Sequence, residues 1–236
     1  AGGAGDDQLA GNNGTDRIDG GEGNDQLGGG AEDDQLEGNA GDDLIEGGEG
    51  NDQLNGDGGN DILQAGLGDD TLNGGADNDT LSGDGGADAI DGGDGIDTAL
   101  YTASTAAVTV NLLTGIGTGG DAEGDRLVSI EHLLGSLFSD LLIGNAESNT
   151  LNGDLGDDTL IGGDGADLLI GDGGTDTALY TTSGTGVTIN LLTSFGRGGE
   201  AEGDRLQGVE NIVASGFDDD LVGDAANNQL IGLGGK

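Results

Sequence analysis

The chain lacks several residue types on which compact proteins depend. Its 236 residues include no cysteine, proline, methionine or tryptophan, and the aromatic residues are two tyrosines and three phenylalanines. Without cysteine neither disulfides nor thiolate metal sites can form, which excludes a disulfide-stapled extracellular scaffold. Because large apolar side chains are sparse as well, they cannot form an ordinary globular core. We therefore expect a thin, elongated fold.

Positive charge is also scarce. Five lysines and arginines stand against 47 acidic residues, and the formal net charge is -42. A surface this negative repels nucleic acid and anionic lipid, so we expect neither as a partner. No stretch is apolar enough to cross a membrane, and insertion into one is not expected. The composition is typical of a chain that is either disordered or held together by cations.

Glycine is abundant, at 56 residues, and it recurs with aspartate in a nine-residue period. An aliphatic residue follows each aspartate by two positions, so the unit reads Gly-Gly-x-Gly-x-Asp-x-Leu-x. The first array, 1–97, carries its aspartates at Asp7, Asp16, Asp25, Asp34, Asp43, Asp52, Asp61, Asp70, Asp79, Asp88 and Asp97. The same register holds Asp140, Asn149, Asp158, Asp167 and Asp176 in a second array, 135–176, and Asp219 and Asn228 in a third, 214–236.

Two related segments, 98–134 and 177–213, interrupt the arrays. They are copies of each other at an offset of 79 residues, with Tyr101 matching Tyr180 and Asp125 matching Asp204. Each copy contains a run of alternating apolar and polar residues, at 108–112 and at 187–191. This alternation predicts a longer, half-buried strand in each. Because both ends of the chain fall within repeats, we expect it to be a piece of a longer protein.

Short strands fit this sequence better than helices. Glycine costs a helix about 1 kcal/mol relative to alanine and recurs every few residues here, and no helical apolar stripe is present. In each nonapeptide only the last three residues have strand character, with the aliphatic side chain pointing inward. If two repeats complete one coil turn, repeats i and i+2 stack about 4.8 Å apart. Asp7, Asp25 and Asp43 then form one column and Asp16, Asp34 and Asp52 another. The predicted fold class is all-β, an elongated parallel β-roll (a β-helix or solenoid).

Such columns of carboxylates favour cation binding. Neighbouring carboxylates repel by about 1 kcal/mol in water and by about 3 to 4 kcal/mol at an effective dielectric constant near 20, which summed along an array rivals the stability of a domain. Glycine lets the backbone turn sharply and aim carbonyl oxygens at one place. A flexible cage of carboxylate and carbonyl oxygens suits Ca²⁺ better than Mg²⁺. The expected metal ligands are every aspartate of the three arrays named above, together with Asp125 and Asp204.

The repeats resemble a known family. The segments at 2–9, 47–54 and 162–169 are similar to the RTX, or haemolysin-type, calcium-binding nonapeptide, which is known to form a parallel β-helix. The interruptions, which contain Thr-Ala-Leu-Tyr and Asn-Leu-Leu-Thr, also resemble segments that interrupt RTX arrays in secreted bacterial proteins. The resemblance implies a parallel β-roll with calcium between its loops, type I secretion, and folding only outside the cell. The expected location is extracellular or at the bacterial cell surface.

Several loops depart from the repeat pattern. Glu32 and Asp77 replace the fourth-position glycine, Ala65 the first, and Asn149 and Asn228 the aspartate. An amide oxygen carries no formal charge, so the loops at Asn149 and Asn228 are expected to bind weakly or to hold no ion. The loops at Asp125 and Asp204 are one residue longer, which leaves calcium binding or its absence equally open. With the stacked loops filled, about a dozen ions would change the net charge to about -18.

Two further residue sets receive structural interpretations. The fifth-position residues are interpreted as turn formers that tolerate left-handed backbone; they are Asp6, Asn24, Asp33, Asp42, Asn51, Asn60 and Asp69. Tyr101 and Tyr180 lie in matching Ala-Leu-Tyr segments, which favours a place in the core over an exposed recognition role.

No enzyme is expected within these residues. The single histidine, His132, matches Asn211 of the second copy, which cannot do acid–base work, and no nucleophile motif is present. The favoured function is a non-catalytic, calcium-triggered structural module of a secreted bacterial protein. One alternative is a surface-layer, adhesin or filament segment that assembles through roll ends or calcium-bridged contacts, which sedimentation with and without calcium would detect. Another is the accessory region of a secreted protease, lipase or toxin whose catalytic domain lies outside the chain.

Overall fold

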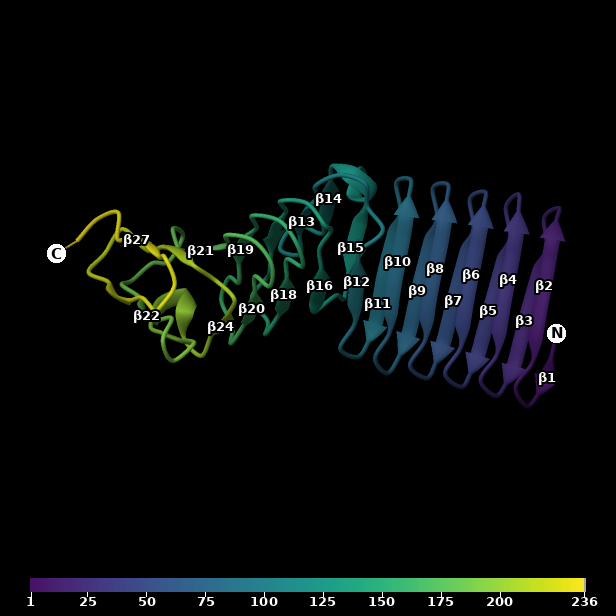
Figure 1. Ribbon diagram of the computed structural model, residues 1–236. Helices are drawn as coiled ribbons and strands as arrows, with labels where there is room; N and C mark the ends of the chain where they lie inside the picture. Colours follow the sequence, from purple (N-terminus) through teal and green to yellow (C-terminus); the bar gives the residue numbers. More distant parts are fainter. Residues whose placement is uncertain (236) are drawn as a thin grey trace. The chain divides into compact units, whose positions relative to one another are not determined.

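The computed structural model describes residues 1–235, and short strands make up most of its regular structure (Figure 1). Two single-turn 3-10 helices, Gly120–Ala122 and Gly199–Ala201, lie in the interruptions. No helix in the described range is long and apolar enough to cross a membrane. The third predicted array, 214–236, ends at Lys236, which lies outside the described residues.

The chain divides into two units. The first comprises Ala1–Ala103 and Gly115–Ile130, and the second comprises Ser104–Thr114 and the residues from Glu131 onward. The first interruption therefore contributes strands to both units. The division of the sequence into three arrays and two interruptions stays a prediction, since the units follow spatial contacts and not repeat boundaries.

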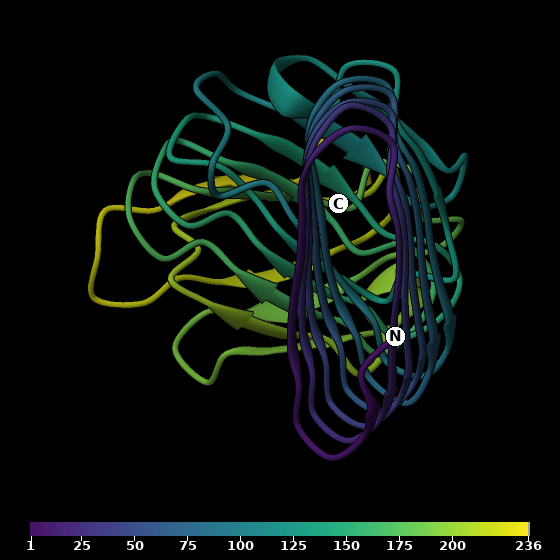
Figure 2. The same ribbon diagram turned by 90° about the vertical axis from the view of Figure 1, so that its right-hand side faces the viewer.

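The first unit is a coil with two parallel sheets. One sheet contains β1 (Gly3–Ala4), β3 (Arg17–Glu22), β5 (Gln35–Ala40), β7 (Gln53–Gly58), β9 (Thr71–Ala76), β11 (Ala89–Asp94) and β15 (Arg126–Val128), with β14 (Ile116–Thr118) antiparallel to β15. The other contains β2 (Gln8–Asn13), β4 (Gln26–Ala31), β6 (Leu44–Glu49), β8 (Ile62–Leu67), β10 (Thr80–Gly85) and β12 (Thr98–Leu100). Odd and even strands alternate between the sheets, so two nonapeptides complete one turn. Seen end-on, the turns of this unit superpose as a flattened coil (Figure 2).

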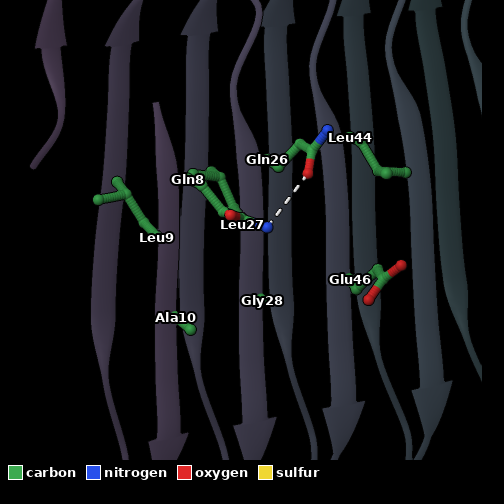
Figure 3. Close-up of a pocket in the computed structure, with 8 residues that line it drawn as sticks. All are labelled: Gln8, Leu9, Ala10, Gln26, Leu27, Gly28, Leu44 and Glu46. Carbon is green, nitrogen blue, oxygen red and sulfur yellow. Dashed lines mark hydrogen bonds between the residues drawn. The ribbon is translucent and has the colours of Figure 1, made fainter. Parts of the chain in front are cut away.

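In the core of the first unit, each nonapeptide contributes one large aliphatic side chain. The second residue of each strand points inward because neighbouring strand residues face opposite sides of the sheet. Leu36, Ile45, Leu54, Leu63, Leu72, Leu81 and Ile90 are each at most 2% exposed. The outer face is mostly polar, with Ile62 and Leu67 of β8 as exposed apolar residues. The Gln8 side-chain amide donates to Gln26 at 3.4 Å, and a shallow hollow at Gly28 lies between Ala10 and Glu46 (Figure 3). The predicted parallel β-roll is confirmed.

The second unit repeats this plan with shorter strands. One sheet has β13 (Thr109–Asn111), β17 (Leu141–Ile143), β19 (Thr159–Ile161), β21 (Thr177–Leu179), β25 (Asn211–Val213) and β27 (Gln229–Ile231). A second sheet has β16 (His132–Leu134), β18 (Thr150–Asn152), β20 (Leu168–Ile170) and β24 (Arg205–Gln207). In a third, β22 (Thr188–Asn190) pairs antiparallel with β23 (Phe195–Arg197) and parallel with β26 (Asp220–Val222).

Strand lengths differ from the sequence-based expectation. Strands β2 to β11 have six residues and not three, because pairing continues through the glycine-rich start of the next repeat, as where Gly21 lies opposite Asn39. The three-residue expectation is confirmed in the second array. The prediction of longer strands in the interruptions is wrong, since β13 and β22 have three residues each. The chain turns directly after them: the Oδ1 atoms of Asn111 and Asn190 accept the backbone N–H three residues on, each at 3.0 Å.

Candidate calcium sites

The periodic aspartates form ladders inside the coil. Along each ladder, after its first member, the Oδ1 atom of an aspartate accepts a hydrogen bond from the backbone N–H of the ladder residue one turn earlier. Asp25 donates to Asp43 at 2.7 Å, and Asp43 donates to Asp61 at 2.8 Å. We call these series the inner ladders. In the first unit they run through Asp7, Asp25, Asp43, Asp61, Asp79 and Asp97, and through Asp16, Asp34, Asp52, Asp70, Asp88 and Asp125. The predicted columns are therefore present, and the second unit has its own, Asp140–Asp158–Asp176 and Asn149–Asp167–Asp204.

The second carboxylate oxygen, Oδ2, of most periodic aspartates is left without a partner. Fifteen buried Oδ2 atoms make no hydrogen bond, and they belong to Asp7, Asp16, Asp25, Asp34, Asp43, Asp52, Asp61, Asp70, Asp79, Asp88, Asp97, Asp158, Asp167, Asp176 and Asp219. Burying a charged oxygen without compensation is costly. Native structures contain few such atoms, so a regular series of them requires an explanation, and a bound ion is one.

A glycine lies beside most of the unpartnered oxygens, and the exceptions are Asp70 and Asp219, which have Ala65 and Ala214 at the corresponding position. At Gly20, the Cβ atom of an alanine would collide with Asp25 Oδ2 and would lie 2.9 Å from the carbonyl oxygen of Gly38. At Gly56 the same two kinds of atom, Asp61 Oδ2 and the Gly74 carbonyl oxygen, line the space. The first glycine of the nonapeptide therefore leaves a recess bordered by a carboxylate oxygen and by a carbonyl oxygen of the next turn.

This donor set fits a hard divalent cation. Within residues 1–235, no group of three or more Asp, Glu, His or Cys side chains is placed to hold a metal ion. A metal in the recess would therefore be held by carboxylate and backbone carbonyl oxygens together. Ca²⁺ accepts such mixed oxygen ligands in flexible geometry, whereas Mg²⁺ demands a near-ideal octahedron.

Burial raises the pKa of several inner-ladder carboxyls, including Asp61, Asp70, Asp79 and Asp88. The pKa of Asp61 rises to about 7: loss of hydration is the largest cause, the charges of Asp79 and Asp43 act in the same direction, and the ladder hydrogen bond opposes the change. The pKa of Asp88 also rises to about 7, and those of Asp70 and Asp79 to about 6, again with burial as the largest cause. Repulsion within the columns, which the sequence predicted, is therefore accompanied by a larger cost of burial.

Three predicted ligands have partners for both oxygens. The hydroxyl of Tyr101 donates to Asp125 Oδ2 at 3.0 Å, and that of Tyr180 donates to Asp204 Oδ2 at 2.9 Å. Asp140 Oδ2 accepts the backbone N–H of Ser136 at 2.5 Å. The tyrosines are 3% and 1% exposed, which confirms their predicted place in the core.

At the two asparagine positions, the side-chain amide donates to a backbone carbonyl. Asn149 Nδ2 donates to the Glu131 oxygen at 3.2 Å, and Asn228 Nδ2 donates to the Glu210 oxygen at 3.0 Å. Glu210 is a ladder member that the nonapeptide pattern missed: its Oε2 accepts the backbone N–H of Asp176 at 2.9 Å. Its position directly before β25, like that of an aspartate before the other strands, is the signal that could have identified it.

The loops with substituted glycines keep the ladder geometry. Glu32 and Asp77 adopt left-handed backbone, with φ of 73° and 76°. Asp34 and Asp79, which follow them, still have an unpartnered Oδ2, as does Asp70 in the loop that begins with Ala65. The Glu32 and Asp77 substitutions therefore leave the recesses at Gly29 and Gly74 in place, whereas the buried Cβ atom of Ala65 occupies the corresponding position beside Asp70. Whether each loop holds an ion stays a prediction.

The fifth-position residues form a second kind of ladder, which the sequence did not predict. Asp42 Oδ1 accepts the backbone N–H of Asn60 at 2.8 Å, and Asn60 Oδ1 accepts that of Asn78 at 3.2 Å. In these outer ladders the side chain caps the following turn, whereas in the inner ladders it caps the preceding one. The seven fifth-position residues named above lie in the bends between strands, as expected of turn formers, but none of them has positive φ, so they do not adopt left-handed backbone.

Comparison with known proteins identifies the repeat. A family model of the RTX calcium-binding nonapeptide repeat, four copies long, matches residues 1–27, 28–63, 64–99, 132–178 and 204–236. A search of curated proteins found no match. The matched segments cover more than half of the chain and include every periodic aspartate of the three arrays. The chain therefore belongs to the RTX calcium-binding nonapeptide repeat family.

Proposed function

We propose that the chain is a non-catalytic structural module of a secreted bacterial protein that folds when calcium fills its inner ladders outside the cell. The observation that carries the proposal is the series of fifteen buried, unpartnered Oδ2 atoms, most of them beside a first-position glycine. About a dozen divalent ions at these positions would change the net charge from -42 to about -18. Ion binding and folding then become a single reaction.

The compartment in which the module folds follows from the affinity of such sites. Oxygen-only sites of extracellular modules have dissociation constants of roughly 10⁻⁴ to 10⁻³ M, so they stay empty inside a cell and fill outside it. Each ion would supply positive charge beside an otherwise unpartnered carboxylate oxygen. The chain's own residues orient that oxygen, because the ladder hydrogen bond to Oδ1 fixes the plane of the carboxylate. The two alternative roles, a self-assembling segment and the accessory region of a secreted enzyme or toxin, stay predictions.

Circular dichroism against calcium concentration tests the proposal. We expect a coil spectrum in chelator and a β spectrum at millimolar calcium, with magnesium at the same concentration much less effective. Asp61→Asn removes one inner-ladder carboxylate and should make the transition less steep in calcium concentration, because about one ion fewer is taken up on folding. Asp91→Asn removes the same charge from an exposed position on β11 and should leave the transition unchanged. A spectrum that millimolar calcium does not change contradicts the proposal.

A further inference from the structure

Asp125 and Asp204 occupy ordinary positions in the inner ladders. Asp125 Oδ1 accepts the backbone N–H of Asp88 at 3.0 Å, and Asp204 Oδ1 accepts that of Asp167 at 2.9 Å. Each is fully buried, at 1% and 0% exposure. By register and burial alone, both would be grouped with the carboxylates that face a cation.

Their surroundings differ at the second oxygen. In place of an open recess, each Oδ2 meets the hydroxyl of a buried tyrosine, Tyr101 or Tyr180. The glycine recess is also changed: Gly162, five residues before Asp167, faces Asp167 Oδ2, whereas Gly199, five residues before Asp204, faces the side chains of Ser183 and Thr185. A phenol hydroxyl is a good donor to a carboxylate, and the ring adds apolar contact in the core.

We propose that Tyr101 and Tyr180 take the place of an ion in the ladders, so that Asp125 and Asp204 bind no calcium. The inference rests on the proposed function, because it presupposes that ions satisfy the unpartnered oxygens elsewhere. It assigns the tyrosines a positioning role: each hydroxyl proton holds Oδ2, and the ladder continues across the interruption without a metal.

The rest of each interruption follows the same principle. At the turn with Asn149, the Nδ2 amide bonds to the carbonyl of Glu131, and at Asn228, 79 residues on, the same bond reaches Glu210. Asp140 Oδ2 is held by the Ser136 N–H. Hydrogen-bond donors of the chain therefore replace ions at successive turns around the first interruption, while the uninterrupted turns of the first array depend on calcium. Around the second interruption the replacement is less complete, because Asp219, the counterpart of Asp140, keeps an unpartnered Oδ2.

Counting bound ions in the full chain tests the inference. The matched pair Asp125→Asn and Asp61→Asn removes one ladder carboxylate each from the first unit, and Asp204→Asn and Asp167→Asn do the same in the second. Equilibrium dialysis at saturating calcium should show about one ion fewer per chain for Asp61→Asn and Asp167→Asn, and the wild-type number for Asp125→Asn and Asp204→Asn. Loss of an ion from Asp125→Asn or Asp204→Asn, with the controls behaving as expected, overturns the inference and leaves the proposed function intact. A wild-type chain that binds no calcium refutes the proposed function itself.

A second variant and a second readout address folding. Tyr101→Phe keeps the ring and removes the hydroxyl proton, so the variant should bind the wild-type number of ions or about one more. A Tyr101→Phe protein that is folded by circular dichroism and binds fewer ions contradicts the inference.

The chain has two tyrosines and no tryptophan, so its intrinsic fluorescence reports on these residues alone. In a Tyr180→Phe background, Asp125→Asn should increase Tyr101 emission at saturating calcium, because the quenching carboxylate is gone, and Asp61→Asn should not. Equal emission in the two variants would show that Tyr101 does not hold Asp125.

Discussion

Without calcium, the first unit should be stable in mild acid and unstable in mild base. Asp61 is 1% exposed, and burial raises its pKa from 3.8 to about 7. Between these two values the folded chain keeps a proton that the unfolded chain releases. Stability therefore falls as the pH rises through this window, since the folded state binds more protons. At neutral pH the single group destabilises the fold by about 4 kcal/mol.

Asp61 is not alone in this respect. The pKa of Asp88 rises to about 7 and those of Asp70 and Asp79 to about 6. A typical domain has a stability of about 5 to 15 kcal/mol, so a few such groups are enough to unfold the unit when all are ionised. Protonation and calcium binding both remove the uncompensated charge, and each should allow the coil to form.

The assay is far-UV circular dichroism combined with urea unfolding, in chelator, at several values from about pH 5 to about pH 8. We expect β structure at pH 5, its loss by pH 8, and its recovery at pH 8 when calcium is restored. In chelator, the neutral variant Asp61→Asn should keep its β structure to a higher pH than the wild type does, and its urea midpoint should be closest to that of the wild type at pH 5. A chelated protein whose stability is constant or increases across this range would refute the reasoning.

Three further predictions concern stability in saturating calcium, measured by urea unfolding. Asp77→Gly should raise the free energy of unfolding by about 1 kcal/mol, because Asp77 has a left-handed backbone with φ of 76°. Glu32→Gly should raise it by less, because this variant also loses the hydrogen bond that the Glu32 carboxylate accepts from the Gly14 N–H at 2.6 Å. Leu63→Ala should cost about 2 to 5 kcal/mol, since Leu63 is completely buried in a core one residue thick. Gly20→Ala should cost about 1 to 3 kcal/mol and weaken calcium binding by filling an oxygen recess, whereas Gly28→Ala, which meets no atom within 4 Å, should be neutral or slightly stabilising. Equal effects of the two glycine variants would show that the recess is not required.

The nine-residue period was sufficient to predict the coil, because it fixes which residues stack. With two repeats in each turn, Asp25 lies next to Asp43 whatever the conformation of the loops. The same register predicts that Leu63 points into the core. Strand length was not predictable in this way. It depends on whether the glycine-rich segment pairs with the neighbouring turn, as it does at Gly21, and this is a property of the assembled sheet.

The sequence also did not predict that Oδ1 of each ladder aspartate makes the ladder hydrogen bond while Oδ2 is either unpartnered or bonded to another donor. Asp61 and Asp125 are both fully buried ladder members, and their difference arises from Tyr101, which is 24 residues from Asp125 along the chain. Likewise, the sequence shows that Asp42 stands at a fifth position, where a turn is expected, but not that its side chain caps the backbone of the next turn. Contacts between residues distant in sequence decide both cases, and a periodic pattern carries information only about residues that share its period.

This periodicity has a cost, which the interruptions offset. In an array of near-identical repeats, a slip of 18 residues brings aspartate against aspartate and leucine against leucine, so neither the ladders nor the core opposes it. Calcium would fill a slipped column as well as a correct one. The Tyr101–Asp125 and Tyr180–Asp204 bonds have no equivalent one turn away, because no other tyrosine is available. A slip would leave a hydroxyl and a carboxylate buried without partners, and the interruptions therefore fix the register of the turns on which they are built.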